Sequence, residues 1–204
     1  MNDLIALMTG IQRFFLNKIK LLDFTPLLLL RIYLAPIFII AGWGKLTAID
    51  STTYYFGEML GMPFPESMAY LAGGAEFFGG IAILIGLATR WFAIPLIMTM
   101  AVAAGTAHWD QGWHALPDDT LTMPWEWRKD LIEEGIERRT AARALLKEHG
   151  NYEWLTSAGN ITILKNGIEF SVTYILMLLP LLFFGAGRLS IDYFLYRLYM
   201  RKDD

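Results

Sequence analysis

The chain has 204 residues, of which 55% are hydrophobic and only 18% are charged, whereas soluble domains average about 45–50% apolar and about 25% charged residues. This composition favours a membrane protein and excludes an intrinsically disordered chain. The net charge of -3 argues against a nucleic-acid-binding protein, which would need a basic excess. The lack of cysteine in the sequence excludes disulfides, thiolate metal sites, iron–sulfur clusters and dithiol redox chemistry.

Amphipathic segments are expected at both ends of the chain. Residues 1–23 carry apolar side chains at helical spacing with basic residues between them, and no small-residue cleavage site follows. This pattern predicts a helix that lies on an anionic membrane surface rather than a cleaved signal. Residues 190–204 predict a second interfacial helix, for which Ser190 is the expected N-cap.

Four apolar stretches are long enough, or nearly so, to cross a bilayer as helices, which takes roughly 20 residues. They cover residues 24–44, 67–89, 91–107 and 166–187. Strands of a membrane barrel would alternate over about 10 residues, and these stretches do not. The sequence therefore predicts an all-α membrane protein with a four-transmembrane-helix bundle.

A long segment, residues 109–165, separates the third and fourth spans. Its first part, residues 109–127, holds four tryptophans and two prolines, which favours a loop at the membrane interface. Residues 129–149 are charged and favour a helix that ends before Gly150.

The distribution of Lys and Arg predicts the orientation in the membrane. Both terminal segments and the turn at Arg90 are basic, whereas the connection between the first two spans offers only Lys45. Both termini are therefore expected in the cytoplasm and the long segment outside. The predicted organisation is an interfacial helix (1–23), three spans (24–108), an external loop with a helical insertion (109–165), a fourth span (166–189) and an interfacial tail (190–204).

The ionisable residues Arg31, Glu76 and Glu169 lie within the predicted spans, and Lys45 and His108 lie at the outer ends of theirs. Such residues are energetically costly in a membrane, so each is a functional hypothesis. Glu76 is expected near the midplane and shares a helix face with four small residues, a pattern typical of close helix packing. We therefore expect Glu76 to face the bundle interior, paired with Arg31 or Lys45, in a polar cavity open to the outer side.

This set of groups suits the head group of a quinone, whose carbonyl oxygens need donors and whose reduction consumes protons. The candidate catalytic, proton-carrying residues are Glu76, His108 and Glu169. The candidate cofactor-binding residues are Arg31, Lys45, Trp43 and Trp109. A proton relay, another polar ligand or a buried ion pair that only sets helix register would need similar groups. No haem or metal site is expected, because the three histidines lack the spacing of a helical metal site.

Charged residues after the fourth span form a further candidate contact. Arg188 and Asp192 are spaced i, i+4 and can meet on one helix face. Together with Arg90 they predict either a charged latch or a plain helix cap.

Several motifs occur in a fixed order: Arg31-x-x-Leu34, Phe38, Ala41-Gly42-x-x-Lys45-Leu46, Gly61-Met62-Pro63, Glu76, Gly86-Leu87-x-Thr89-Arg90, His108 and Gly185-x-Gly187-Arg188-x-Ser190-x-Asp192. In this order they resemble the DoxX family. The resemblance implies a four-helix protein of the bacterial inner membrane. Some members of that family are small membrane subunits of thiosulfate:quinone oxidoreductases, and others are linked to redox homeostasis. The segment 109–165 is longer than the family pattern, so no role is carried over to it.

Two functional hypotheses follow. The first is a membrane subunit of a quinone-linked oxidoreductase or redox-homeostasis complex, whose redox centres come from quinone or a protein partner. The second is a non-enzymatic adaptor or maturation factor that recruits a partner through residues 109–165. Transport of protons or small solutes is a weaker third hypothesis, suggested by prolines within the spans. The expected partners are membrane lipid and a protein of a redox complex, not nucleic acid.

Overall fold

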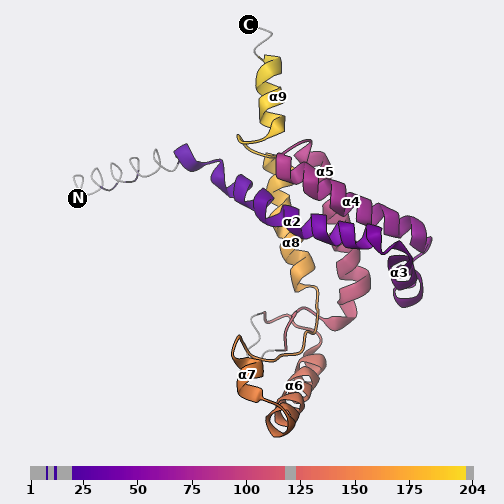
Figure 1. Cartoon of the computed structure of the whole chain (residues 1–204). Helices are drawn as coiled ribbons and strands as arrows, with labels where there is room; N and C mark the ends of the chain where they lie inside the picture. Colours follow the sequence, from indigo (N-terminus) through magenta and orange to yellow (C-terminus); the bar gives the residue numbers. More distant parts are fainter. Residues whose placement is uncertain (1–7, 9–11, 13–19, 118–122, 201–204) are drawn as a thin grey trace. The chain divides into compact units, whose positions relative to one another are not determined.

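The computed structural model describes residues 8, 12, 20–117 and 123–200. The regular elements in these residues are all helices, so the all-α prediction is confirmed (Figure 1). The predicted interfacial helix 1–23 falls almost entirely outside the described residues. The chain divides into two compact units, which are treated separately below; the second comprises Glu58–Gly61 and Ile97–Leu176, and the first comprises the rest.

Among the described residues, three helical stretches are long and apolar enough to cross a membrane: α2 (Thr25–Thr47), α4 (Pro65–Ile85) and Thr89–Gln111. The third stretch begins as α5 (Thr89–Ala103) and continues as a π-helical segment, Ala104–His108. The predicted fourth span forms α8 (Glu169–Phe184), which is apolar but has only 16 residues. Its length of about 24 Å falls short of a hydrocarbon core of about 30 Å.

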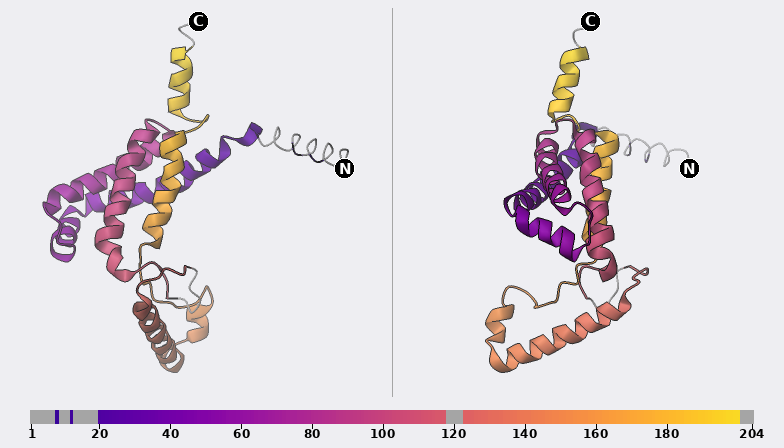
Figure 2. Two further views of the ribbon diagram at one scale, coloured as in Figure 1. Left: turned by 180° about the vertical axis from the view of Figure 1, so that it is seen from behind. Right: turned by 90° about the vertical axis from the view of Figure 1, so that its right-hand side faces the viewer.

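Close packing of α2 against α4 organises the first unit (Figures 1 and 2). A Cβ atom on Gly42 would lie 2.3 Å from the backbone N of Phe77, and one on Gly80 would lie 2.9 Å from the backbone N of Ile39. Small residues allow membrane helices to approach in this way. Glu76 shares the packed face of α4 and is only 2% exposed, which confirms that it points into the protein.

Substitution of Gly42 tests this packing. Gly42→Ala is expected to destabilise the protein by about 1–3 kcal/mol, because the added methyl group must push two backbones apart. Gly44→Ala is the matched control, since a Cβ there meets nothing within 4 Å. Thermal unfolding in detergent should show a lower midpoint for the first variant only, and equal midpoints would contradict the close approach.

Short elements complete the first unit. A 3-10 turn at Lys20–Leu22 precedes α2, and α3 (Ile49–Tyr54) leads into a π-helical segment, Tyr55–Met59. The predicted C-terminal helix is present as α9 (Ile191–Met200), and Ser190 caps it by accepting a hydrogen bond from the N–H of Tyr193 at 3.1 Å. Several large apolar side chains of α9 are exposed, and its position at a membrane interface stays a prediction.

The second unit contains most of the segment between the spans. A 3-10 turn, Trp109–Gln111, opens it, and α6 (Lys129–His149) has the predicted bounds and ends at Gly150. A short helix, α7 (Tyr152–Thr156), follows after a tight turn (Figure 2). The described residues between Trp109 and α8 therefore form a folded module with one long helix.

Candidate functional site

An ion pair joins the middle of α4 to the last turn of α2. The Nζ atom of Lys45 lies 2.5 Å from Oε2 of Glu76, and the side chains are 28% and 3% exposed, respectively. The sequence left open whether Arg31 or Lys45 compensates Glu76, and the structure shows Lys45. Gly73 makes room for this contact, because a Cβ there would lie 3.2 Å from the Cβ of Lys45. The carboxylate is therefore enclosed, while the ammonium group stays accessible on one side.

Aromatic rings line the same seam between α2 and α4. The rings of Trp43 and Phe77 are 5.5 Å apart between centroids and tilted by 38°. Trp43 is 56% exposed, so its ring presents a flat apolar surface beside Phe77, the neighbour of Glu76 in the sequence. Of the predicted cofactor-binding residues, Lys45 and Trp43 therefore lie in the region of Glu76.

Arg31 has a different set of partners. Its guanidinium group donates four hydrogen bonds of 2.7–2.9 Å to the carbonyl oxygens of Ile83, Leu84, Ala186 and Leu189. The first two are carbonyls in the last turn of α4, where carbonyl groups lack i+4 partners in the helix, and that of Ile83 also accepts from the N–H of Gly86 at 3.1 Å. The contact at Ile83 is two turns, or about 10 Å, along α4 from Glu76. Arg31 therefore satisfies backbone groups, and a role for it in quinone binding stays a prediction.

The other predicted catalytic residues belong to the second unit. The Nδ1 atom of His108 lies 2.9 Å from the carbonyl oxygen of Asn166. Oε2 of Glu169 accepts a hydrogen bond from the N–H of Ala115 at 2.9 Å, and Asn166 donates to the carbonyl of Ala115. Both side chains thus tie the start of α8 to the loop that follows the third span. A cavity shared with Glu76 stays a prediction.

Trp109, the last of the predicted cofactor-binding residues, packs within the second unit. Its ring lies 5.0 Å from that of Trp127 between centroids, and the indole N–H of Trp127 donates to the Trp109 carbonyl oxygen at 3.3 Å. Trp109 is 54% exposed. These contacts are those of an aromatic loop, and a ligand-binding role for Trp109 also stays a prediction.

The second unit contains a buried cluster around Glu126 that was not predicted from the sequence. Oε2 of Glu126 lies 2.8 Å from Nδ1 of His114 and 3.1 Å from Nζ of Lys165. All three residues are at most 8% exposed. The carboxylate also accepts hydrogen bonds from the backbone N–H groups of Trp113, His114 and Arg128. The only hint in the sequence is one acidic residue between Trp125 and Trp127.

The environment of Glu126 favours its charged form. Burial raises the pKa of the carboxyl group, but the hydrogen bonds from the backbone of His114 and Arg128, the His114 side chain and the backbone of Trp113 outweigh this effect and lower the pKa to about 2. The imidazole of His114 also accepts from the N–H of Met123 at 3.4 Å. The cluster therefore joins three separate stretches of the second unit through one ionised carboxylate.

Asp192 caps a helix and does not pair with an arginine among the described residues. Its carboxylate oxygens accept hydrogen bonds from the N–H groups of Ala88 at 2.7 Å and Thr89 at 3.0 Å, at the N-terminus of α5. Arg188 instead lies 3.3 Å from Asp23. Of the two predicted arrangements, the structure shows the cap rather than the charged latch.

The cap can be tested by substitution. Asp192→Ala is expected to cost about 1–2 kcal/mol of stability, because two N–H groups at the start of α5 lose their acceptor. Asp23→Ala, which removes a half-exposed ion pair, should cost less than about 1 kcal/mol. Thermal unfolding and folded yield in detergent measure both. A larger loss for Asp23→Ala would contradict the cap.

Comparison with known proteins identifies a family and several relatives to which this chain is similar. The sequence model of the DoxX family matches residues 26–109, which hold α2, α4 and most of the third span-length helix. The chain is similar to "Putative oxidoreductase CatD" of Bacillus subtilis, with 34% identity over 36% of this chain and 52% of the relative. No solved structure matches.

Two inner membrane proteins of Escherichia coli are also similar. YqjF is 41% identical over 37% of this chain and 55% of its own length, and YphA is 36% identical over 102 residues, which are 72% of its length. The matched region thus spans about half the length of CatD and YqjF. The family match ends at residue 109, so most of the second unit lies outside it.

Proposed function

Because the chain belongs to the DoxX family of membrane proteins, we propose that it is an integral subunit of a quinone-linked oxidoreductase or redox-homeostasis complex. Its relatives YqjF and YphA are named as inner membrane proteins, and its apolar helices agree with a location in the bacterial inner membrane. The name of CatD refers to an oxidoreductase, which supports a redox role for the chain.

The observation that carries the proposal is the Lys45–Glu76 pair. One N–H of the ammonium group is used by Glu76, so two remain for a ligand oxygen on its exposed side. The exposed Trp43 ring, which packs against Phe77 next to Glu76 in the sequence, offers a flat apolar surface. These features fit a quinone head group, which when bound supplies carbonyl acceptors and takes up two electrons and two protons. Lys45 would orient and polarise a carbonyl oxygen, and Glu76 would hold and deliver a proton to that atom.

Quinone reduction takes up two electrons, and the sequence has no cysteine to ligate an iron–sulfur cluster or form a redox dithiol, so in this proposal a protein partner delivers them. This requirement supports a subunit role rather than a self-contained enzyme.

Quinone content and electron transfer test the proposal. The chain purified from native membranes is expected to carry quinone detectable by extraction and chromatography. Glu76→Gln should abolish quinone-linked electron transfer in membranes, and Lys45→Arg, which keeps the cation, should retain part of it. Glu133→Gln, at an exposed position on α6, is the control. Absence of quinone together with unchanged electron transfer in Glu76→Gln membranes would overturn the proposal.

The proposal includes a four-helix topology with α8 as the fourth span. A fourth crossing would bring both basic termini to the cytoplasmic side, as the Lys and Arg distribution favours. Because the chain has no cysteine, single cysteines report the topology directly. A membrane-impermeant maleimide should label Ser157→Cys in intact cells, and Tyr199→Cys only after permeabilisation. Labelling of both in intact cells would contradict a fourth span.

A second candidate function, a non-enzymatic adaptor, draws support from the folded second unit. The Glu126 cluster holds the loops that carry α6, so this helix is presented on an ordered base. Replacing residues 129–156 by a flexible linker keeps Glu126 and Lys165 in place. For an adaptor, this change should abolish partner co-purification and spare quinone binding. A partner retained by that variant would count against the adaptor.

A further inference from the structure

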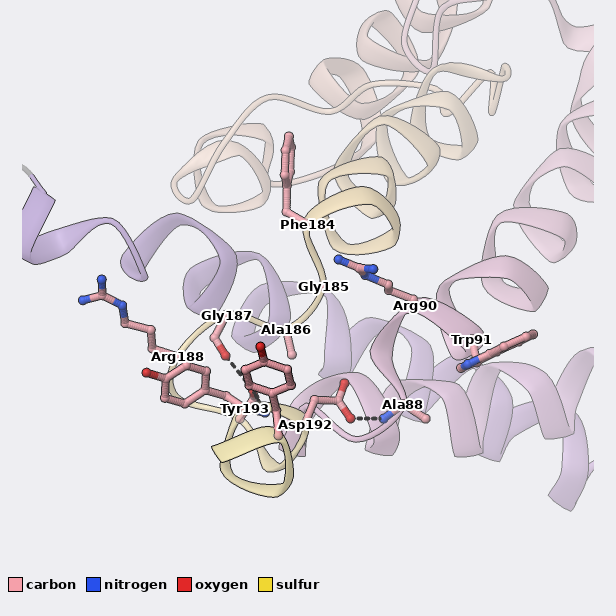
Figure 3. A pocket seen from close by; sticks show the side chains of 12 residues that line it. Ala88, Arg90, Trp91, Phe184, Gly185, Ala186, Gly187, Arg188, Asp192 and Tyr193 are labelled. Atoms are coloured by element: carbon pink, nitrogen blue, oxygen red, sulfur yellow. Dashed lines mark hydrogen bonds between the residues drawn. The ribbon is translucent and has the colours of Figure 1, made fainter. Parts of the chain in front are cut away.

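A cavity of about 510 Å³ opens in the first unit where α4 connects to α5 and α8 connects to α9 (Figure 3). Two span-length helical stretches meet here, since α4 ends at Ile85 and the next begins at Thr89. The ends of such helices lie where the hydrocarbon core gives way to lipid head groups. The cavity is therefore placed at the level of the head groups.

Arg90 supplies an uncommitted cation to this cavity. Its side chain extends toward Gly185 in Figure 3, and a Cβ on Gly185 would lie 3.4 Å from its Nε. Within residues 20–117 and 123–200, Arg90 makes no hydrogen bond or ion pair. Asp192 also lines the cavity, but its carboxylate accepts hydrogen bonds from the N–H groups of Ala88 (Figure 3) and Thr89. The acidic group therefore does not neutralise Arg90 by direct contact.

Arg188 also lines the cavity, but its guanidinium group points away from Arg90 in Figure 3. It is paired with Asp23 at 3.3 Å, and both side chains are about half exposed. Such an exposed ion pair contributes little to stability, so Arg188 can exchange Asp23 for a stronger partner. Arg90 is therefore the main candidate donor, since its guanidinium group is a forked donor that matches the oxygens of a phosphate group in pairs.

The surroundings of the cavity suit a ligand with an apolar tail. Trp91, Phe184 and Tyr196 line it and are 77%, 73% and 60% exposed. Aromatic side chains gather at the boundary between lipid and water, where they contact both glycerol and acyl chains. We propose that this cavity binds the phosphodiester head group of an anionic membrane phospholipid, with Arg90 as the main donor to its phosphate oxygens. This site is separate from Lys45 and Glu76, and it is occupied whether or not the chain handles quinone.

Native mass spectrometry of the full chain in a neutral detergent tests the proposal. The probes are phosphatidylglycerol, which is anionic, and phosphatidylcholine, which carries the same phosphodiester without net charge. Phosphatidylglycerol should bind at least several-fold more tightly. Arg90→Gln should weaken phosphatidylglycerol binding roughly tenfold, because it removes a charge-assisted hydrogen-bonded pair. Arg188→Gln should weaken this binding less. Arg138→Gln, an exposed arginine on α6, is the control and should change nothing.

Other outcomes would overturn the site. Unchanged phosphatidylglycerol binding in Arg90→Gln protein would exclude Arg90 as the donor, and equal binding of phosphatidylcholine would exclude recognition of charge. Competition by glycerol phosphate or inorganic phosphate at the same concentration would identify a soluble phosphate ligand instead. Arg90→Lys serves where Arg90→Gln gives no folded protein, because it keeps the charge, loses the forked donor and should bind with intermediate strength.

Discussion

Glu126→Gln is expected to cost about 3–5 kcal/mol of stability, because it leaves the ammonium group of Lys165 buried without its counter-charge. The amide also offers fewer acceptor sites to the three backbone N–H groups that bond to the carboxylate. The unfolding midpoint in detergent, followed by tryptophan fluorescence, should fall accordingly. Trp113 and Trp125 report on this region, since their rings are 5.7 Å apart between centroids.

Two further variants distinguish the buried charge from a general effect of substitution. Glu126→Gln combined with Lys165→Met removes both charges and should recover part of the loss, because no unpaired charge remains. Glu137→Gln, at an exposed position on α6, should have no measurable effect. If the double variant loses as much stability as Glu126→Gln and Lys165→Met lose together, the ion pair is not the source of the stability.

The same carboxylate predicts a pH dependence. The pKa of Glu126 is about 2 in the folded protein against 4.5 in the unfolded chain, so the ionised group stabilises the fold above about pH 4.5. This contribution, about 3 kcal/mol from the difference in pKa, is lost as the pH falls from 4.5 toward 2. The unfolding midpoint of the native protein should drop over this range, and that of Glu126→Gln should drop less. Identical pH profiles would contradict the assignment.

Lys45→Met is expected to lower stability by about 3 kcal/mol, because Glu76 would remain buried between α2 and α4 without a counter-charge. Lys45→Met combined with Glu76→Leu should be more stable than Lys45→Met alone, since the buried charge is then absent. The thermal unfolding midpoint in detergent measures both, with Gly44→Ala as a neutral change on α2. If the double variant gains nothing over Lys45→Met, the pair does not stabilise the helix contact.

These stability variants also separate structure from redox function. In the proposed mechanism, the Lys45→Met and Glu76→Leu double variant folds but transfers no electrons to quinone. A folded double variant with full electron transfer would leave the pair as a purely structural contact, and the adaptor function would then be favoured. Glu126→Gln should destabilise the second unit and leave the phosphatidylglycerol site of the first unit unaffected.

Much of the fold follows from local sequence. The apolar stretches determine the three span-length helices, because length and hydropathy are properties of the segments themselves. The pattern of charged and apolar residues sets the bounds of α6, and the small residues around Glu76 show which face of α4 is packed. Each of these features depends on residues within a few helical turns of one another. The sequence of one segment is therefore enough to predict it.

The partners of the charged groups depend instead on residues far apart in the chain. Lys45 and Glu76 are 31 positions apart, and Glu126 and Lys165 are 39 apart. Arg31 reaches carbonyl oxygens 52 to 158 positions away. Every residue carries the same backbone carbonyl group, and nearly every residue carries a backbone N–H. The sequence therefore does not show which of these groups at a helix end will bond to a distant side chain, because this depends on how the helices pack. For this reason the sequence by itself determined a helical membrane protein with charges inside it. Only the tertiary structure decided that Lys45 meets Glu76, that Arg31 binds backbone and that Glu126 organises the second unit.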